Sequence, residues 1–469
     1  MLRVYNTLIR KKEDFLPRGS PVQFFVCGPT VYSRSHIGHA RTYIAFDVIA
    51  KYLRTEGYAV QYLQNITDID DKIINRAKEL GVPPLELSKK ETEHYFADMR
   101  SIGVDSVSHY APASNYIPEI ISQIERLIKK GNGYEAGGSV YFDISSFLAF
   151  GTLSNQNLKA LQKATRTDDD PNKKHAHDFV LWRSREKNNS KEPTWESPWG
   201  FGRPGWHIED TAITEKEFGP QYDVHGGGIE LVFPHHEAER AQAEAVSEKT
   251  PFVRYWLHTG WVTVKGEKMS KSLGNFITIE EILKKFSSEA LRLLMLQTHY
   301  RSPLEYSEEH ITAGENRVHK LKEFRAHLRI IQEKNLYGTS RILLEVGEEN
   351  ETNPVVKFKK AMNDDFNTPL ALSTFDSLVS DTNELLAAKN PPTQESIAKI
   401  FEFFEYVNNI FGILPAEIKI PLEILQLAEE RDTMRRDQKW NEADKIRDIL
   451  LVQGFVISDT TDGFIIIPK

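Results

Sequence analysis

The sequence has a single cysteine among its 469 residues. One cysteine excludes a disulfide bond within the chain, so a reducing compartment is the simplest environment for it. No stretch approaches the ~20 consecutive apolar residues that span a bilayer. The opening residues, MLRVYNTLIRKKEDF, also lack the apolar core of a secretion signal. We therefore expect a cytoplasmic protein that makes no membrane contact.

The chain also has fewer basic than acidic residues. The chain has 59 Lys and Arg against 67 Asp and Glu, a formal net charge of -8. This balance disfavours a protein that coats nucleic acid along its whole surface, although a local basic track is compatible with it. At ~100–200 residues per domain, the length predicts about three domains, and no internal repeat is visible.

The first part of the chain alternates between two apolar patterns. Residues 22–27, VQFFVC, predict a short buried strand, and residues 39–57 carry apolar side chains at helical spacing. A second strand is expected over 59–65, followed by the acidic start of a helix in ITDIDDKIINRAKELG. This order predicts an α/β domain with a parallel sheet, whose ligands gather beyond the carboxyl ends of the strands. Cys27 lies at such an end.

Later segments have different patterns. Residues 110–200 look like an excursion from the sheet, and its last part, EPTWESPWGFGRPGWH, is too rich in proline and glycine for regular structure. The strand and helix pattern resumes at YDVHGGGIELVFPHHEAERAQAEA. Residues 278–412 have an almost wholly helical period. Residues 421–469 predict one charged helix and then two short strands around an Asp-Gly turn.

The tetrapeptide HIGH, residues 36–39, is the first candidate site. Its two histidines lie three residues apart at the mouth of the first predicted helix, where the rings and the helix amides can face one phosphate. Gly38 between them leaves room for a close approach of backbone or base. Taken alone, such a pair is more often structural or simply exposed.

The segment GEKMSKSLGNF, residues 266–276, is the second candidate. Lys268 and Lys271 stand three apart between serines and just before a glycine, in a stretch too polar for a core. A solvated loop is the plain interpretation, because most charge runs are simply hydrated. The pair of motifs, HIGH after the first strand and KMSKS after the last part of the sheet, is much more specific than either one.

In this order and spacing the motifs resemble the class I aminoacyl-tRNA synthetases, and most closely the cysteinyl-tRNA synthetases. The resemblance covers nearly the whole chain, in the segments CGPTVY, HIGH, TDIDDKI, DFVLW, SPWGFGRPGWHIE, HGGG, FPHHE, KMSKSLGNF, HYRSPLEYS and DDFNTPLAL. It implies a Rossmann-type parallel sheet with an inserted connective region, followed by an α-helical bundle domain and a small C-terminal domain.

The resemblance also implies a division of the chain into parts. These are the first half of the Rossmann catalytic domain (1–110), the connective insertion (111–200), the second half of the catalytic domain (201–262), the KMSKS loop with a stem-contact region (263–300), the helical bundle that binds tRNA (301–414) and a small anticodon-recognition domain (415–469).

The implied activity is ATP-dependent formation of cysteinyl adenylate, with Mg²⁺ accompanying ATP, and transfer of the cysteinyl group to the 3' end of tRNA(Cys). Because pyrophosphate leaves with a high charge, cations and donors aimed at that charge lower the barrier. His36, His39, Lys268 and Lys271 are assigned this catalytic role and also bind ATP, together with Gly38 and Gly227. The enzyme is expected to act as a monomer.

A zinc site is implied as well. The family holds zinc with two cysteines, a histidine and a glutamate, and the matching positions here are Cys27, Asp210, His235 and Glu239. Zinc would bind the thiolate of the substrate, which the hydroxyl of serine cannot imitate.

Asp210 departs from the family pattern, since GWHIED stands where GWHIEC is expected. A carboxylate can ligate zinc but is a harder ligand, so weaker retention or loss of the metal remains an alternative. Without a metal, His235 and Glu239 would form a helix-surface pair, and Cys27 would be a small buried hydrophobe.

Substrate-recognition residues follow from the resemblance. Gly28, Thr67 and Trp206 are expected at the cysteine pocket, although Trp206 could instead be a core aromatic residue. The anticodon readers map onto Arg435, Trp440 and Asp444, where an exposed Trp stacks on a base and the charged groups bind its edge. The alternative for these three is a solvated amphipathic helix.

Two other functions fit parts of the sequence. A cysteine ligase of the glucosaminyl-inositol type would share the activation site, but the helical region and anticodon-like tail beyond about residue 300 argue against it. A non-catalytic RNA-binding paralogue is the second alternative. Only Asp210 supports it, because HIGH and KMSKS are intact.

Overall fold

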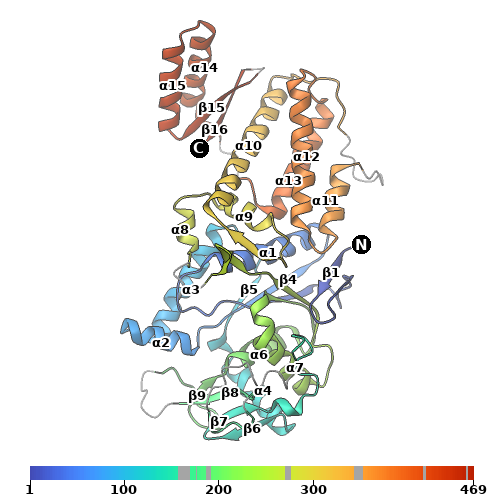
Figure 1. Cartoon of the computed structure of the whole chain (residues 1–469), viewed down its shortest axis with the longest axis vertical. Helices are drawn as coiled ribbons and strands as arrows, with labels where there is room; N and C mark the ends of the chain where they lie inside the picture. The colour runs from blue at the N-terminus through green and yellow to red at the C-terminus, as the bar shows by residue number, and fades with distance from the viewer. Residues whose placement is uncertain are drawn as a thin grey trace. The chain divides into compact units, whose positions relative to one another are not determined.

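The computed structural model describes residues 1–156, 170–175, 177–185, 192–269, 276–342, 352–415, 419–460 and 463–469. The chain forms two compact units (Figure 1). Unit 1 comprises Met1–Lys285, Thr298–Tyr306 and Asn363–Phe366, and unit 2 comprises the remaining segments, Phe286–Gln297, Ser307–Met362 and Asn367–Lys469. Among the described residues, no helix combines the length and the apolar character needed to cross a bilayer.

A five-stranded parallel sheet forms the centre of unit 1, in the order β11-β10-β3-β4-β5. Its strands are β3 (Val22–Val26), β4 (Val60–Ile66), β5 (His109–Pro112), β10 (Tyr222–Gly228) and β11 (Val253–Thr259). The α/β prediction is confirmed; the strand expected at 22–27 is one residue longer than β3, and the one expected at 59–65 is shifted by one residue from β4. Parallel strands are buried on both faces, which explains their continuous apolar runs.

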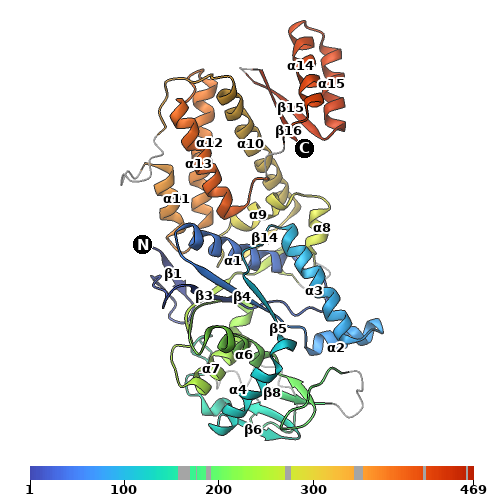
Figure 2. The same ribbon diagram turned by 180° about the vertical axis from the view of Figure 1, so that it is seen from behind.

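Helices cover both faces of this sheet. Helix α1 (Ile37–Thr55) lies on one face, and α6 (Trp206–Phe218) and α7 (Glu237–Ser247) lie on the other (Figure 2). Helix α1 presents a long row of buried residues to the strands, and the ring of Phe24 on β3 meets Phe46 of α1 edge to face at 6.0 Å. Two of the residues proposed as catalytic, His36 and His39, lie where α1 begins.

The order in which the chain adds strands to the sheet reverses at β3, in the middle of the sheet. From β3 the chain adds β4 and β5 on one side, and after the insertion it returns to add β10 and β11 on the other. In open α/β sheets, ligands bind at the carboxyl ends of the strands where the order reverses. Here β3 ends at Cys27, whose N–H donates to the carbonyl of Gly226 on β10 at 2.9 Å.

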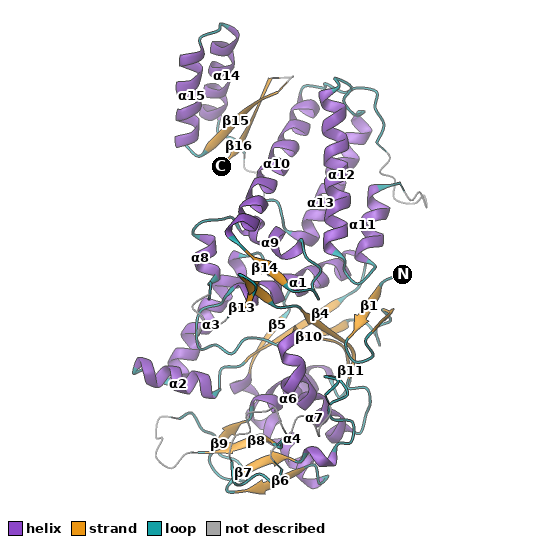
Figure 3. Ribbon diagram, viewed as in Figure 1, coloured by secondary structure: helices purple, strands orange, loops and turns teal. Residues whose placement is uncertain are grey.

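The insertion has regular structure of its own. Helix α4 (Ile117–Lys129) precedes an antiparallel sheet in the order β6-β7-β8-β9 (Figure 3). Its strands are β6 (Gly133–Ala136), β7 (Ser139–Phe142), β8 (Phe179–Ser184) and β9 (Gly202–Pro204). The expectation of irregular structure at 192–207 is wrong at its end, because β9 pairs with β8 and Trp206 starts α6. A glycine and a proline are tolerated in β9 because it lies at the edge of its sheet.

The remaining helices and strands of unit 1 lie outside the five-stranded sheet. They are β1 (Arg3–Asn6), β2 (Lys11–Asp14), α2 (Asp71–Leu80), α3 (Pro84–Ser101), the hairpin β12 (Val262–Val264) and β13 (Glu267–Lys268), α8 (Ile279–Leu283) and β14 (Leu304–Tyr306).

Unit 2 is mostly helical, as predicted. Helices α9 (Ser288–Leu296), α10 (Glu308–Glu333), α11 (Pro354–Met362), α12 (Thr368–Ala387) and α13 (Gln394–Phe411) form its bundle. Aromatic rings fill the bundle core, for example Phe375 and Phe404 with centroids 4.5 Å apart.

The end of the chain differs from the prediction in one respect. Two helices, α14 (Leu422–Arg436) and α15 (Trp440–Val452), replace the single expected helix, so that prediction is wrong. The chain reverses through Gln438, which has a left-handed φ of 59° without a glycine or proline to mark the turn. The predicted hairpin is confirmed as β15 (Phe455–Thr460) and β16 (Gly463–Pro468), which pair antiparallel.

Candidate active site and metal centre

The HIGH motif forms the N-terminus of α1. His36 is the N-cap: its Nδ1 accepts from the N–H of Gly38 at 3.0 Å and of His39 at 3.4 Å, while its own N–H donates to Nδ1 of His39 at 3.3 Å. The two rings stack with centroids 3.8 Å apart. The first turn of the helix is thus closed by the histidines themselves. A Cβ on Gly38 would collide with the His36 ring, at 2.8 Å from Cε1.

The two ends of the lysine loop reach this motif. On one side, the terminal methyl carbon of Met269 lies 3.6 Å from where a Cβ on Gly38 would stand. On the other side, the N–H of Ile37 donates to the carbonyl of Ile277 at 3.1 Å, and Ile279 donates to Ser35 at 3.1 Å. The motifs are therefore neighbours in space although they are far apart in sequence.

Of the two predicted lysines, the structure describes the backbone of Lys268 but not Lys271. Lys268 is the last residue of β13, and its backbone pairs with Thr263 of β12. Lys271 lies outside the described residues. The flanking contacts bring the described ends of the loop to the N-terminus of α1.

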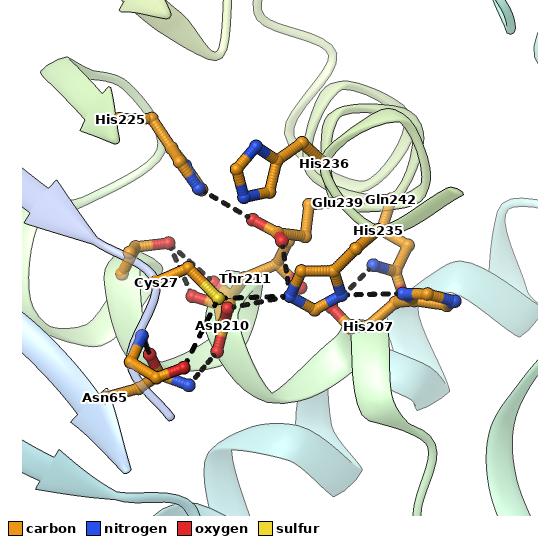
Figure 4. A network of polar contacts seen from close by, with 12 residues as sticks. Cys27, Asn65, His207, Asp210, Thr211, His225, His235, His236, Glu239 and Gln242 are labelled. Atoms are coloured by element: carbon orange, nitrogen blue, oxygen red, sulfur yellow. Dashed lines mark hydrogen bonds and ion pairs between the residues drawn. The ribbon is translucent and has the colours of Figure 1, made fainter. Parts of the chain in front are cut away.

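Cys27, Asp210 and His235 each bring a possible ligand atom within 4.8 Å of one another at the carboxyl end of β3, whereas Glu239 forms such a group with His225 and His236 (Figure 4). Nε2 of His235 lies 3.5 Å from Sγ of Cys27, 3.1 Å from Oδ2 of Asp210 and 2.9 Å from Oε1 of Glu239. All four side chains are buried. The sulfur of Cys27 and one carboxylate oxygen each of Asp210 and Glu239 thus lie around one ring nitrogen of His235.

Each ligand is delivered by a different element. Cys27 follows β3, Asp210 lies in the first turns of α6, and Glu239 lies in the first turn of α7. His235 lies in the π-turn Val232–His236 that leads into α7, so it shares a face with Glu239 at i and i+4, as the sequence predicts.

Burial controls the charges in this cluster. It raises the pKa of the Cys27 thiol well above its usual value, with a further contribution from Asp210 and Glu239. Burial also raises the pKa of Glu239. For His235, burial works to lower the pKa, but Glu239 and Asp210 outweigh it and raise the pKa above the ordinary value. A thiol and two carboxyls packed around one imidazole need a cation to carry their full negative charge together.

The donor set therefore fits a divalent cation. Both carboxylate oxygens of Glu239 lack a hydrogen-bond donor in the described structure, although Oε1 lies 2.9 Å from Nε2 of His235 and Oε2 lies 3.4 Å from Nε2 of His225. One sulfur, one ring nitrogen and two carboxylate oxygens are ligands that Zn²⁺ accepts. The alternative of a helix-surface pair does not describe His235 and Glu239, because both are fully buried.

Four further histidines surround the cluster, and the sequence prediction did not assign them to it. Nδ1 of His207 lies 2.8 Å from Nδ1 of His235, and Nδ1 of His236 lies 2.8 Å from Nε2 of His258. His225 contacts the hydroxyl of Tyr222 through Nδ1, at 2.6 Å. Burial lowers the pKa of His207, His225 and His236 well below the usual value and that of His258 to about 3. These rings are therefore neutral and can fix the orientation of neighbouring groups.

A signal for these histidines was present in the motifs. His207 is part of GWHIE, His225 opens HGGG and His236 belongs to FPHHE. His207 meets His235 and His236 meets His258, each pair from different elements, so the motifs alone did not say which ring meets which. His258 on β11 belongs to no motif in the set.

The residues predicted for the cysteine pocket border the cluster. The half-buried indole of Trp206 stacks on the His235 ring, with centroids 4.1 Å apart and planes 14° apart. Thr67 is buried just after β4 and accepts from Nδ2 of Asn65 at 3.3 Å. A Cβ on Gly28 would lie 1.7 Å from the carbonyl oxygen of Asn65, so only glycine allows this backbone approach. Trp206 is thus not simply a core residue.

Gly227, predicted to contact ATP, has a packing role in the structure. A Cβ there would lie 2.7 Å from Cε1 of His236, and a Cβ on Gly226 would lie 2.4 Å from the Phe46 ring. The glycine run of β10 thus lets helix α1 and the histidine turn pack closely on either side of the strand.

The predicted anticodon residues lie in the α14 and α15 pair of unit 2. Trp440 is 53% exposed, and the guanidinium of Arg435 lies 5.3 Å from its ring centroid. Asp444 is one turn further along α15, where it pairs with Arg447 at 3.1 Å. An exposed indole with a cation on one face is a surface on which a base can stack.

Comparison with known proteins agrees with this geometry. Residues 16–316 match the family model of the class I (C) tRNA synthetase catalytic domain, and residues 357–415 match the DALR domain. The chain is 43% identical to a cysteine–tRNA ligase of Thermococcus onnurineus, over 99% of this chain and 98% of the relative. The chain belongs to the cysteinyl-tRNA synthetase family. A family member from Heliobacterium modesticaldum, also named a cysteine–tRNA ligase, is 41% identical over 98% of both chains.

Solved structures of other class I synthetases share the fold. The Mycobacterium tuberculosis methionyl-tRNA synthetase in complex with methionyl-adenylate has a TM-score of 0.60 at 16% identity, covering 84% of this chain and 90% of its own. The Agrobacterium radiobacter leucyl-tRNA synthetase gives a TM-score of 0.60 at 13% identity, covering 84% of each chain. This cysteinyl-tRNA synthetase relative thus has the class I architecture.

Proposed function

We propose that this protein is a cysteine–tRNA ligase. It activates L-cysteine with ATP to form cysteinyl adenylate and pyrophosphate, and then transfers the cysteinyl group to the 3' end of tRNA(Cys). The observation that carries the proposal is the meeting of residues 35–38 with both ends of the 266–276 loop, beside the buried cluster at the carboxyl end of β3.

In the activation step the carboxylate of cysteine attacks the α-phosphorus of ATP, and the bond to the β-phosphate oxygen breaks. The enzyme therefore supplies alignment and charge stabilisation rather than a nucleophile. In His36 and His39 the Nδ1 atoms serve the helix cap, so their phosphate contacts fall to Nε2. Lys268 and Lys271 approach the leaving pyrophosphate from the loop, Gly38 leaves room for the nucleotide and Mg²⁺ accompanies ATP.

Gly227 contributes to the same nucleotide site by keeping the strand surface free of a side chain. Its neighbour His236 already fills the space on one side, so the open backbone of β10 is what remains for the ribose. Gly227 thus serves both the close packing of β10 and the binding of the ribose.

The substrate cysteine is held beside the metal cluster. Cys27, Asp210, His235 and Glu239 would hold a Zn²⁺ ion, which would supply an acceptor for the substrate thiolate that the hydroxyl of serine cannot match.

Trp206 and Thr67 border the pocket, and Gly28 lets the backbone approach the substrate closely. The stacking of Trp206 on His235 supports this placement, because the ring covers a ligand while staying half-exposed. The pocket thus combines one soft ligand site with one apolar wall.

Transfer to tRNA uses the rest of the chain. We assign residues 1–110 and 201–262 to the catalytic domain, 111–200 to the connective insertion, 263–300 to the loop and stem-contact region, 301–414 to the tRNA-binding bundle and 415–469 to anticodon recognition. The DALR match at 357–415 supports the role of the bundle. Trp440 stacks on an anticodon base while Arg435 and Asp444 bind base edges. The protein acts as a monomer.

The family membership disfavours the alternatives. Relatives that match over 97–99% of their length and of this chain carry the name cysteine–tRNA ligase, and a DALR domain matches residues 357–415. A glucosaminyl-inositol ligase needs neither the DALR domain nor an exposed stacking tryptophan.

Two assays test the proposal. Exchange of labelled pyrophosphate into ATP must depend on cysteine and fail with serine. Charging of a tRNA(Cys) transcript must then give cysteinyl-tRNA, while a tRNA of another specificity stays uncharged. Exchange without charging would support the amine-ligase alternative, and absence of both would support the non-catalytic one.

A further inference from the structure

The two oxygens of the Asp210 carboxylate have different partners. Oδ1 accepts a hydrogen bond from Nδ2 of Asn65 at 2.6 Å, whereas Oδ2 faces Nε2 of His235 at 3.1 Å (Figure 4). Asn65 and Asp210 are 0% and 1% exposed, so water does not compete for either oxygen. The amide of Asn65 therefore engages the oxygen that does not face His235.

The orientation of Asn65 is fixed by the backbone of a neighbouring strand. Its Oδ1 accepts from the N–H of Gly28, which can only donate. The amide nitrogen must then be the end that faces Asp210. The position of Asn65 near the end of β4, beside the end of β3, thus determines which group meets Asp210.

We propose that Asn65 is a positioning residue that makes Asp210 bind the metal ion through one oxygen only; this inference rests on the metal site proposed above. A carboxylate has two ligand atoms, whereas the thiolate of a cysteine has one. Binding through both oxygens would add a ligand and crowd the position that the substrate sulfur needs. The amide hydrogen bond restricts Asp210 to Oδ2, and the aspartate then occupies a single coordination position, as a thiolate does.

The second carboxylate of the cluster is divided in the same way. Oε1 of Glu239 lies 2.9 Å from Nε2 of His235, and Oε2 lies 3.4 Å from Nε2 of His225. The His225 ring is in turn held through Nδ1 by the hydroxyl of Tyr222 at 2.6 Å. Each carboxylate thus has one oxygen facing His235 and one facing a separate side chain, and Glu239 also belongs to a second group of possible ligands with His225 and His236.

The test is a comparison of Asn65→Ala in two backgrounds, the natural chain and Asp210→Cys. Zinc affinity of the full-length protein is measured by competition with a chromophoric chelator. With Asp210 present, Asn65→Ala is expected to weaken zinc binding by about 10- to 100-fold, the usual effect of losing a group that orients a ligand. With cysteine at 210 the same change should weaken it by less than about 3-fold, because a thiolate has no second ligand atom to restrain.

Cobalt substitution gives a second measurement. Bound Co²⁺ in four-coordination absorbs strongly in the visible, and added ligands reduce that absorption. Asn65→Ala should lower the visible band in the natural background while the near-ultraviolet band from the Cys27 thiolate is retained. If Asn65→Ala does not fold, as judged by circular dichroism, Asn65→Ser takes its place, since serine keeps an oxygen but is too short to reach Asp210.

The outcomes separate this inference from the proposed function. Loss of zinc affinity confined to the Asp210 background, with the cobalt change, supports it. Equal losses in both backgrounds, or no loss in either, overturn it and leave the enzyme assignment intact. A natural protein that shows cysteine-dependent exchange without binding Zn²⁺ or Co²⁺ overturns both the metal site and this inference. A protein without exchange activity that still shows the background-dependent loss retains this inference while the ligase function fails.

Discussion

The indole of Trp206 stacks on the imidazole of His235, with ring centroids 4.1 Å apart and planes inclined by 14°. This contact joins the wall of the proposed cysteine pocket to one of the proposed metal ligands. A substitution of Trp206 is therefore expected to affect both the substrate site and the metal cluster.

Trp206→Ala is expected to raise the KM for cysteine by about 3- to 10-fold, the equivalent of one lost aromatic contact. Trp206→Phe keeps a ring over His235 and should stay within about 3-fold of the natural protein. Pyrophosphate exchange at varied cysteine concentration measures this. Equal KM values in all three proteins would remove Trp206 from the pocket.

Lys271→Ala is expected to reduce kcat for pyrophosphate exchange by about 100- to 1,000-fold, because the loop supplies charge where pyrophosphate develops it. The KM for cysteine should change little, since the lysine approaches only the phosphates. Lys265→Ala is the matched control, because Lys265 is an exposed lysine in the turn between β12 and β13. A comparable loss in Lys265→Ala would mean that the loop needs only general positive charge.

Gly28→Ala should destabilise the protein by about 3 kcal/mol, the upper end of the cost of overpacking. The physical reason is the added Cβ, which would lie 1.7 Å from the carbonyl oxygen of Asn65. Gly19→Ala is the control, because nothing lies within 4 Å of its added Cβ. Thermal unfolding compares the two; a stable Gly28→Ala variant would show that β3 and β4 can separate at this point.

Trp440→Ala is expected to lower kcat/KM for charging tRNA(Cys) by about 10- to 100-fold, since stacking of one base contributes about 1–3 kcal/mol. Exchange of pyrophosphate into ATP should be unchanged, because that reaction does not involve tRNA. Val452→Ala, an 88% exposed position on the same helix, serves as the control. A loss in exchange activity would point to misfolding instead of lost recognition.

A pH effect is expected in the hairpin of unit 2. The hydrogen bond from Arg431 holds the pKa of Asp459 below its ordinary value, and Arg435 adds to this. A carboxyl with a lowered pKa stabilises the fold above its unfolded pKa of about 3.9, and the stabilisation is lost as pH falls through the folded pKa. Hydrogen exchange of the β15 and β16 amides in Asp459→Asn should therefore be faster than in the natural protein at pH 7, and the difference should disappear towards pH 3.

The sequence by itself determined the parts that depend on local pattern. The apolar runs at β3 and β4 and the helical period of α1 each follow from a few neighbouring residues. Spacing within one element also predicted that His235 and Glu239 share a face, whereas the full set of site residues came from the resemblance to the family.

The tertiary structure decided how these groups meet. No local pattern links Asn65 to Asp210 or His236 to His258, since each pair comes from separate strands and helices. The break between α14 and α15 was also missed, because Gln438 adopts a left-handed conformation that nothing in its sequence requires. Contacts of this kind depend on which elements pack together, and packing is decided by the whole fold rather than by adjacent residues.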